Sequence, residues 1–140
     1  MTPDTPIQYP YVDRHPSLPG SGLMPFLPIS LTRGSHSASV QALLDTGASV
    51  NVLPFDIGLQ LGADWDKQTV VVPLAGNLAA VAARGLVVSA TVGPFPAVRL
   101  GFAWARLNTL PVILGQANFF EEFDVCFFRS RAIFEVKPRS

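Results

Sequence analysis

The stretch ALLDTGAS, residues 42–49, places a single carboxylate, Asp45, on a tight turn between two apolar segments. Residues 43–44 bring the chain in as a strand, Gly47 permits a sharp bend, and residues 50–53 return the chain to a core. An Asp that only bonds its own backbone as a turn former is the plainest interpretation. The apolar segments on both sides instead favour a rigidly held, reactive carboxylate.

A second stretch supports that interpretation. VILGQ, residues 112–116, is an apolar strand ending at a glycine, and ANFFEEFDV, residues 117–125, is typical of a short helix with Phe side chains on one face. Together with LDTGA, residues 44–48, these elements resemble the active-site loop, the apolar-apolar-Gly element and the following helix of the retropepsin-like aspartic proteases. Their order fits too, with about 65 residues between the motifs for a flap hairpin. The resemblance covers roughly residues 26–137.

The resemblance implies a mainly β fold: a closed retropepsin-like β-barrel or sandwich with a flap hairpin and one or two short helices, one lobe per chain. We expect this domain over residues 26–140. The final hairpin is longer than the single retroviral C-terminal strand and looks more like the bacterial or DNA-damage-inducible subgroup. Residues 1–25 contain six prolines, which predicts an extended Pro-rich arm that joins no sheet.

Alternation of apolar and polar residues predicts the individual elements. Pro54 can open a short helix that Gly62 stops. The expected strands are residues 26–32 and 38–44 as a hairpin, 50–53, 69–74 and 78–92 around a flap tip at 75–77, 98–104, 111–114, and a closing hairpin of 125–128 and 132–137.

Composition excludes several functions. The formal net charge is zero with scattered basic residues, which argues against nucleic acid as a ligand. No apolar run reaches about 18 residues and Met1 precedes no signal sequence, so we expect no membrane span and favour a cytoplasmic location. Apolar residues make up 49% and charged residues 14% of the chain, which suggests apolar surface covered by a partner, a second copy being one candidate.

The cysteine and the histidines carry no predicted chemistry. The single cysteine, Cys126, lies in an apolar run and is expected to be a small buried hydrophobe. His15 and His36 have no Cys or Glu at metal-ligand spacing, so we predict no metal site and no cofactor.

The count of catalytic motifs bears on assembly. Hydrolysing a peptide with carboxylates needs two of them around one water, one protonated and one ionised. The chain has one Asp-Thr-Gly, and its other acids have no comparable setting. A protease built on Asp45 therefore requires Asp45 of a second subunit, placed by a twofold axis.

Further roles follow from the resemblance. Thr46 looks like the threonine whose hydroxyl crosses to the partner loop, and Gly47 like the residue whose carbonyl meets the substrate backbone. Ala48 occupies a position where pepsins carry a hydroxyl, and its absence predicts a mildly acidic optimum. Predicted substrate-binding residues are Ala48, the flap tip Leu74, Ala75, Gly76 and Asn77, and the strand residues Val112 and Ile113, with Leu78 as a further pocket wall. For the apolar ones, plain packing is the alternative.

Two family charges are missing together. Retroviral enzymes carry an acid four residues after the catalytic Asp and an Arg after the conserved Gly, which form an ion pair near the dimer contact. Here the positions hold Ser49 and Gln116, so neither charge is left unpaired. The retroviral dimer contact is therefore not expected in the same form.

Two functions remain open from sequence. The first is a homodimeric aspartic endopeptidase that cuts extended peptides at apolar sites. The second is a peptide-binding or dimerisation module that keeps the fold with little turnover, because the flap tip lacks the several glycines of retroviral flaps. The intact Asp45-Thr46-Gly47 speaks for the first.

Overall fold

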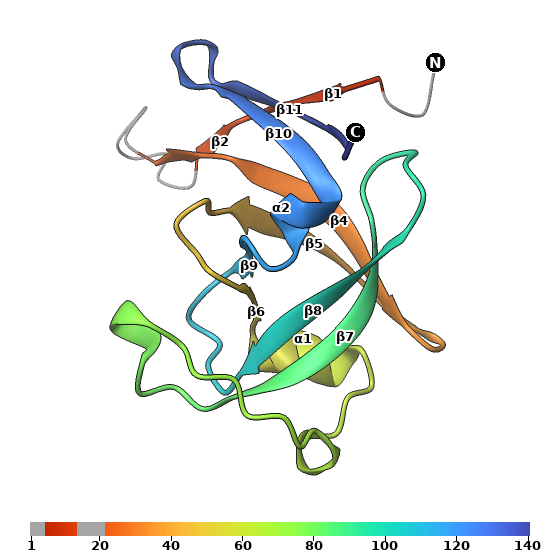
Figure 1. Ribbon diagram of the computed structural model, residues 1–140, viewed down its shortest axis with the longest axis vertical. Coiled ribbons are helices and arrows are strands. Elements are labelled where there is room, and N and C mark those ends of the chain that lie inside the picture. Colours follow the sequence, from red (N-terminus) through yellow and green to blue (C-terminus); the bar gives the residue numbers. More distant parts are fainter. Residues whose placement is uncertain (1–4, 14–21) are drawn as a thin grey trace.

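The computed structural model describes residues 5–13 and 22–140. Six strands close into a barrel in the order β4-β5-β9-β6-β8-β7 (Figure 1). The barrel strands are β4 (Phe26–Arg33), β5 (His36–Leu44), β6 (Asn51–Leu53), β7 (Ala83–Thr91), β8 (Val98–Ala105) and β9 (Val112–Leu114). The expected mainly β barrel with one lobe per chain is confirmed.

The β4–β5 hairpin delivers the chain to the Asp45 turn. Its two strands pair antiparallel from Phe26↔Leu43 to Arg33↔His36. The turn between them uses Gly34, whose φ of 59° is open to glycine at little cost. β5 then pairs parallel with β9, opposing Leu44 to Leu114. The two stretches that the sequence singles out therefore lie side by side.

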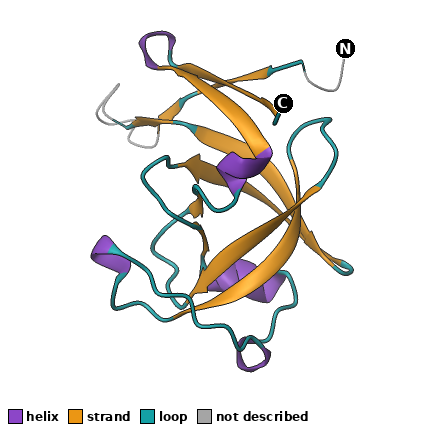
Figure 2. Cartoon of the chain, in the orientation of Figure 1, coloured by secondary structure: helices purple, strands orange, loops and turns teal. Residues whose placement is uncertain are grey.

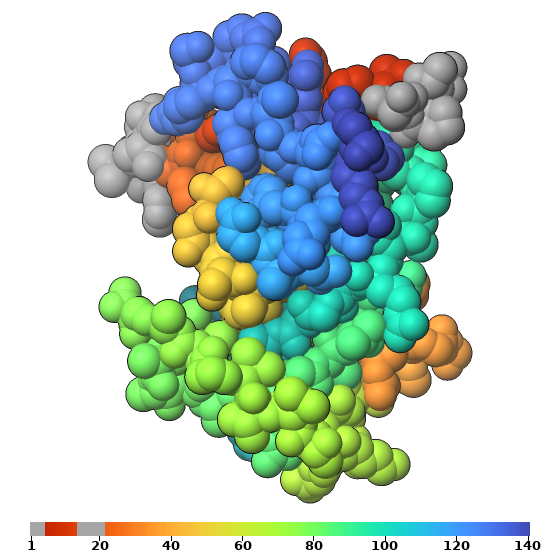
Figure 3. Space-filling view, in the orientation of Figure 1, coloured from red at the N-terminus to blue at the C-terminus, as the bar shows by residue number. Residues whose placement is uncertain are grey.

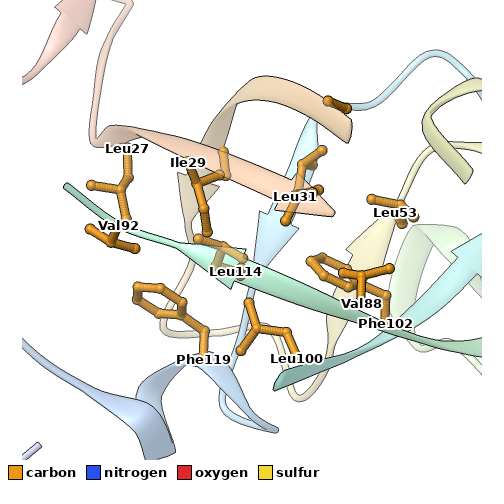
Figure 4. Packing of buried hydrophobic residues seen from close by; sticks show 14 of the residues in the cluster. Leu27, Ile29, Leu31, Leu53, Val88, Val92, Leu100, Phe102, Leu114 and Phe119 are labelled. Carbon is orange, nitrogen blue, oxygen red and sulfur yellow. The ribbon is translucent and has the colours of Figure 1, made fainter. Parts of the chain in front are cut away.

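Alternation along the strands determines the core. The predicted inward residues of β4 are buried, and so are Leu100, Phe102 and Trp104 of β8. Figure 4 shows side chains from β4, β7, β8 and β9 converging with Phe119 inside the barrel. Removing this apolar surface from water is the main stabilising contribution to the fold.

Short helices cap the barrel (Figure 2). α1 (Phe55–Gln60) follows Pro54 and ends before Gly62, whose φ is 75°, as the sequence predicts. The remaining helices are α2 (Phe119–Glu122) and the single 3₁₀ turns η1 (Trp65–Lys67), η2 (Gly76–Leu78) and η3 (Arg129–Arg131). Among the described residues, no helix has the length and apolarity needed to cross a bilayer.

A second sheet lies outside the barrel. It has the order β1-β11-β10, formed by β1 (Ile7–Pro10), β10 (Phe123–Phe128) and β11 (Ile133–Pro138). The predicted closing hairpin is confirmed. Figure 1 shows β1 beside β11 at the top of the view.

The expectation that the N-terminal arm joins no sheet is wrong for residues 7–10, 12–13 and 23–24. Ile7 opposes Val136 and Tyr9 opposes Phe134 in an antiparallel ladder, and Tyr9 stacks on the Phe134 ring at 5.5 Å. Burial there raises the pKa of Tyr9. Residues 12–13 (β2) pair with residues 23–24 (β3), while residues 1–4 and 14–21 of the predicted arm lie outside the described residues.

The prediction for Cys126 is also wrong, because its side chain is exposed. Phe123 faces the core, and since strand side chains alternate, Val125 and Phe127 share its face. Cys126 therefore points outward, opposite Glu135 on β11. The apolar run of β10 conceals this alternation.

The predicted flap hairpin is only partly regular. Its return arm begins at Ala83 rather than at residue 78, and residues 76–78 form η2. Residues 69–74 meet β7 through an isolated bridge between Val71 and Arg84, with the Val72 N–H donating to the Ala83 carbonyl at 3.0 Å. Three of the four residues 79–82 are alanines, which have weak strand propensity, so the pattern that predicts a strand there is overridden locally.

Gly58 sets the fit of α1 against β8. A Cβ at this position would overlap the indole ring of Trp104, which is fully buried. We expect Gly58→Ala to lower the free energy of unfolding by about 1–3 kcal/mol, although alanine favours helices. Urea unfolding followed by Trp fluorescence measures this.

Gly101→Ala is the matched control, since a Cβ there meets nothing within 4 Å. Its free energy of unfolding should be unchanged or slightly higher, as expected for Gly→Ala in a strand. Equal losses in both variants would contradict the assigned contact.

Candidate active site

The Asp45 turn is held by its own backbone and by β9. The Asp45 N–H donates to the Leu114 carbonyl at 3.0 Å, and the Ala48 N–H donates to the Asp45 carbonyl at 3.1 Å. The Gly47 N–H donates to Asp45 Oδ1 at 3.0 Å. The carboxylate is half-buried. One oxygen is thus oriented by the loop itself, which fixes the direction of the side chain.

Residues 115–117 bind the other side of the turn. The Gln116 N–H donates to the Ala48 carbonyl and the Ala117 N–H to the Ser49 carbonyl, each at 2.9 Å. The Gln116 side chain donates through Nε2 to the Thr46 carbonyl at 2.8 Å. A glutamine thus anchors the loop with a neutral hydrogen bond within the chain.

Gly115 allows this close approach. A Cβ on Gly115 would lie 2.5 Å from the Val50 carbonyl oxygen and 2.7 Å from that of Ala48. Both neighbours are backbone atoms, so no side-chain rotation relieves the contact. Glycine is therefore required for packing at the end of β9.

One buried amide ties these segments to the barrel. Asn51 is fully buried, and its Oδ1 accepts from the Gly115 N–H at 2.8 Å. Its Nδ2 donates to the Gly101 carbonyl at 2.9 Å and to Asn118 Oδ1 at 3.2 Å. Asn118 Oδ1 also accepts from the Gly101 N–H at 3.0 Å, and its Nδ2 donates to the Arg99 carbonyl at 3.0 Å. The network links β6, β8 and the segment after β9.

Sequence reasoning missed this network. The available signal is a lone amide between Val50 and Val52, in a strand that is otherwise apolar. A buried amide needs partners. Its partners lie 50, 64 and 67 positions further along the chain.

A cleft of about 340 Å³ opens beside Asp45. Its lining includes most of the predicted site residues together with three that were not predicted, Ser49, Val50 and Val52. The predicted lining residues are Asp45, Gly47, Ala48, Leu74, Ala75, Gly76, Asn77, Leu78 and Ile113. The fold therefore brings the Asp45 turn and the predicted flap tip to one hollow.

Two predicted residues lie elsewhere. Thr46 is exposed at the turn and does not line the cleft. Val112 is buried in the barrel core and is absent from this cleft, because strand alternation turns it away from the side that Ile113 faces. The placement of Val112 in the cleft is therefore a wrong prediction.

One other hollow, of about 350 Å³, includes an acid, Asp56, which is exposed in the first turn of α1. A larger one of about 460 Å³ lies over β4 and β5 and includes Tyr9 and Gly93, but no acid, histidine or cysteine. Within residues 5–13 and 22–140, no group of three or more His, Cys, Asp or Glu is arranged to hold a metal ion. The cleft at Asp45 is the hollow with a carboxylate on a fixed turn.

Comparison with known proteins agrees with this geometry. A sequence model of the family described as Aspartyl protease matches residues 32–117. The chain belongs to the aspartyl protease family. No curated protein matches this chain significantly.

Two solved structures have a similar fold. A retropepsin-like aspartic protease from Rickettsia conorii matches with a TM-score of 0.62 and 12% identity, covering 95% of this chain and 92% of that one. EIAV protease in complex with the inhibitor HBY-793 matches with a TM-score of 0.53 and 18% identity, covering 74% of this chain and 92% of that one. This member of the aspartyl protease family is thus retropepsin-like in fold.

The Asn51 network yields a stability prediction. Asn51→Ala leaves the Gly115 N–H without its acceptor and removes the donor to the Gly101 carbonyl. We expect the free energy of unfolding to fall by about 3 kcal/mol, since each buried unpaired group costs about 1–3 kcal/mol. Urea unfolding monitored by circular dichroism measures it.

Asn108→Ala is the matched control. The Asn108 side chain accepts one exposed hydrogen bond, from the Asp56 N–H at 2.9 Å. Its loss should cost less than about 1 kcal/mol. If Asn51→Ala lowers the free energy of unfolding as little as Asn108→Ala does, the buried network does not stabilise the fold as described.

Proposed function

We propose that this chain is one half of a homodimeric aspartic endopeptidase that hydrolyses extended peptides at apolar sites. The observation that carries the proposal is the Asp45 carboxylate, oriented by the Gly47 N–H at the edge of a cleft. The chain has one Asp-Thr-Gly. The second carboxylate of the dyad is therefore assigned to Asp45 of the partner subunit.

In this proposal the two Asp45 carboxyls share one proton, because two such close carboxylates are not both ionised. The ionised member takes a proton from a water, whose oxygen attacks the scissile carbonyl carbon. The protonated member donates a hydrogen bond to the carbonyl oxygen as negative charge develops there. Transfer of a proton to the amide nitrogen then allows the C–N bond to break.

The neighbouring residues have supporting roles. Thr46 is exposed, so its hydroxyl is available to a partner loop, while Gln116 holds its carbonyl. The Gly47 carbonyl meets the substrate backbone. Ala48 supplies no hydroxyl to the ionised pair, which keeps the expected optimum mildly acidic.

The proposed substrate follows from the cleft lining. Val50, Val52, Leu74 and Ile113 give it apolar walls. An extended peptide places alternate side chains against such walls while its backbone pairs with the protein. Ala75, Gly76 and Asn77 line the same cleft and take the role of a flap tip in this proposal.

One observation favours a second candidate, a peptide-binding or dimerisation module with little turnover. Residues 76–78 form a 3₁₀ turn rather than the tip of a regular hairpin. A flap that does not close leaves the carboxylate in water, where its electrostatic effects are weaker.

Cleavage of an unstructured protein distinguishes the two candidates. Casein incubated with the protein from about pH 4 to 7 should be cut between apolar residues, and pepstatin should slow the cutting. Asp45→Asn should lower the rate at least about a hundredfold, because the shared proton is lost. Mass spectrometry of the peptides measures rate and site preference together.

Asp56→Asn is the control, since Asp56 is an exposed acid in the first turn of α1. It should cleave at the wild-type rate. Casein cleavage by pure Asp45→Asn protein at the wild-type rate would contradict the protease proposal. Casein binding without cleavage by the wild type across this pH range would favour the binding module.

A further inference from the structure

We propose that Gln116 is a positioning residue for Asp45 and acts through the peptide unit between Thr46 and Gly47. The inference rests on the proposed function, in which Asp45 activates a water. Gln116 Nε2 donates to the Thr46 carbonyl at 2.8 Å. The N–H of the same peptide unit belongs to Gly47 and donates to Asp45 Oδ1 at 3.0 Å. One planar group therefore carries both hydrogen bonds and connects Gln116 to the carboxylate.

The two hydrogen bonds depend on each other. A trans peptide unit is planar, so its C=O and N–H point in opposite directions and turn together. A rotation that takes the Thr46 carbonyl away from Gln116 also takes the Gly47 N–H away from Asp45 Oδ1. Donation to a carbonyl oxygen also polarises the peptide unit, which makes its N–H a stronger donor. Gln116 thus affects both the direction and the strength of the hydrogen bond to the carboxylate.

The turn that contains this peptide unit has a second form available to it. The Ala48 N–H donates to the Asp45 carbonyl at 3.1 Å, which closes a β-turn. Its central peptide unit is the one between Thr46 and Gly47. The two common forms of a β-turn differ by a flip of that unit, and the flipped form needs a positive φ at the third residue.

Gly47 is the third residue of the turn, and glycine accepts a positive φ at little cost. Its φ is not positive in this structure. The glycine therefore leaves the flip open, and a contact from outside the turn is what favours the observed form. Gln116 supplies such a contact on the carbonyl side of the peptide unit.

The backbone of Gln116 is fixed to the barrel and to the turn. Its N–H donates to the Ala48 carbonyl at 2.9 Å, and the N–H of Gly115 donates to Asn51 Oδ1 at 2.8 Å. Figure 3 shows the gold atoms of the Asp45 turn against the light blue atoms of the segment that follows β9. The amide of Gln116 therefore holds the peptide unit from a fixed base.

Exposure and position distinguish this role from plain stabilisation and from substrate binding. Gln116 and Thr46 are both exposed, so water can replace the amide at the carbonyl and no buried group is left unpaired. Gln116 does not line the cleft beside Asp45. Loss of the amide should therefore lower turnover, with little change in stability or in KM.

Gln116→Met tests the role, because methionine keeps the length of the side chain and has no donor. We expect kcat for casein cleavage to fall roughly tenfold, since the carboxylate loses its fixed direction. KM should change less than about twofold. Initial rates with fluorescein-labelled casein measure both constants. The midpoint of urea unfolding should stay at the wild-type value.

Gln116→Glu adds a pH signature. A neutral carboxylic acid can donate to the Thr46 carbonyl, whereas a carboxylate cannot. Glutamate ionises at about pH 4.3, so the variant should cleave casein within about twofold of wild type at about pH 4. By about pH 6.5 its rate relative to wild type should fall roughly tenfold. Dividing by the wild-type rate removes the titration of Asp45, the titratable group on this turn. The relative rate of Gln116→Met should be the same at both pH values.

Gln60 provides the matched controls. Its Nε2 also donates to an exposed carbonyl, that of Ser37, at 3.3 Å, and it does not line the cleft. Gln60→Met and Gln60→Glu should cleave casein at the wild-type rate at both pH values.

The amide proton of Gly47 gives a readout that needs no activity. Weakening the hydrogen bond that an amide donates moves its proton resonance upfield. Gln116→Met should therefore shift the Gly47 amide proton upfield in the NMR spectrum of labelled protein. Gln60→Met should leave this resonance in place.

The outcomes separate this inference from the proposed function. An unmoved Gly47 amide, or a wild-type kcat in Gln116→Met, overturns the positioning role, and casein cleavage by wild type then leaves the protease intact. A higher KM with unchanged kcat also overturns it, because it assigns Gln116 to substrate binding. A shifted Gly47 amide without casein cleavage by wild type supports the link between Gln116 and the turn and counts against the protease.

Discussion

The buried amide of Asn51 connects three segments that have to be placed together for the barrel to close. Its hydrogen bonds to Gly115, Gly101 and Asn118 join β6, β8 and the end of β9. Because an unpaired amide in the core is costly, these segments assemble as one unit. Residues 115–117 then bind the Asp45 turn directly. The position of the carboxylate is therefore a consequence of core structure rather than of a flexible loop.

A second constraint is that the chain supplies one such carboxylate. The cleft beside Asp45 has apolar walls but a single acid, so the proposed chemistry depends on association. In this account the barrel holds one carboxylate and a second subunit supplies the other. The Gln116 side chain donates a hydrogen bond to the Thr46 carbonyl, so the loop is held by a contact within one subunit.

The sequence predicts those elements whose formation depends on residues close together in the chain. Alternation predicts the β4–β5 hairpin and the inward face of β8, and proline and glycine bound α1. The strand predicted over residues 78–82 is absent, because strand formation there depends on pairing across the sheet. The pairing of Ile7–Pro10 with β11 was not predicted, for a related reason. Proline is tolerated in a strand where its missing N–H faces away from the neighbouring strand, and the sequence does not show which way each residue faces. The Asp45 turn is predictable as a motif, whereas the Asn51 network is not, because its partners are distant in the chain.

The central claim is that catalysis uses Asp45 from two subunits, and mixing of subunits tests it most directly. Wild type at fixed concentration is allowed to exchange with a tenfold excess of Asp45→Asn protein before casein is added. If each active site needs both carboxylates, the random formation of mixed dimers should lower cleavage to about a tenth of its starting value. Cleavage that is unchanged by the excess would contradict the account, because it would mean that one chain carries a complete site.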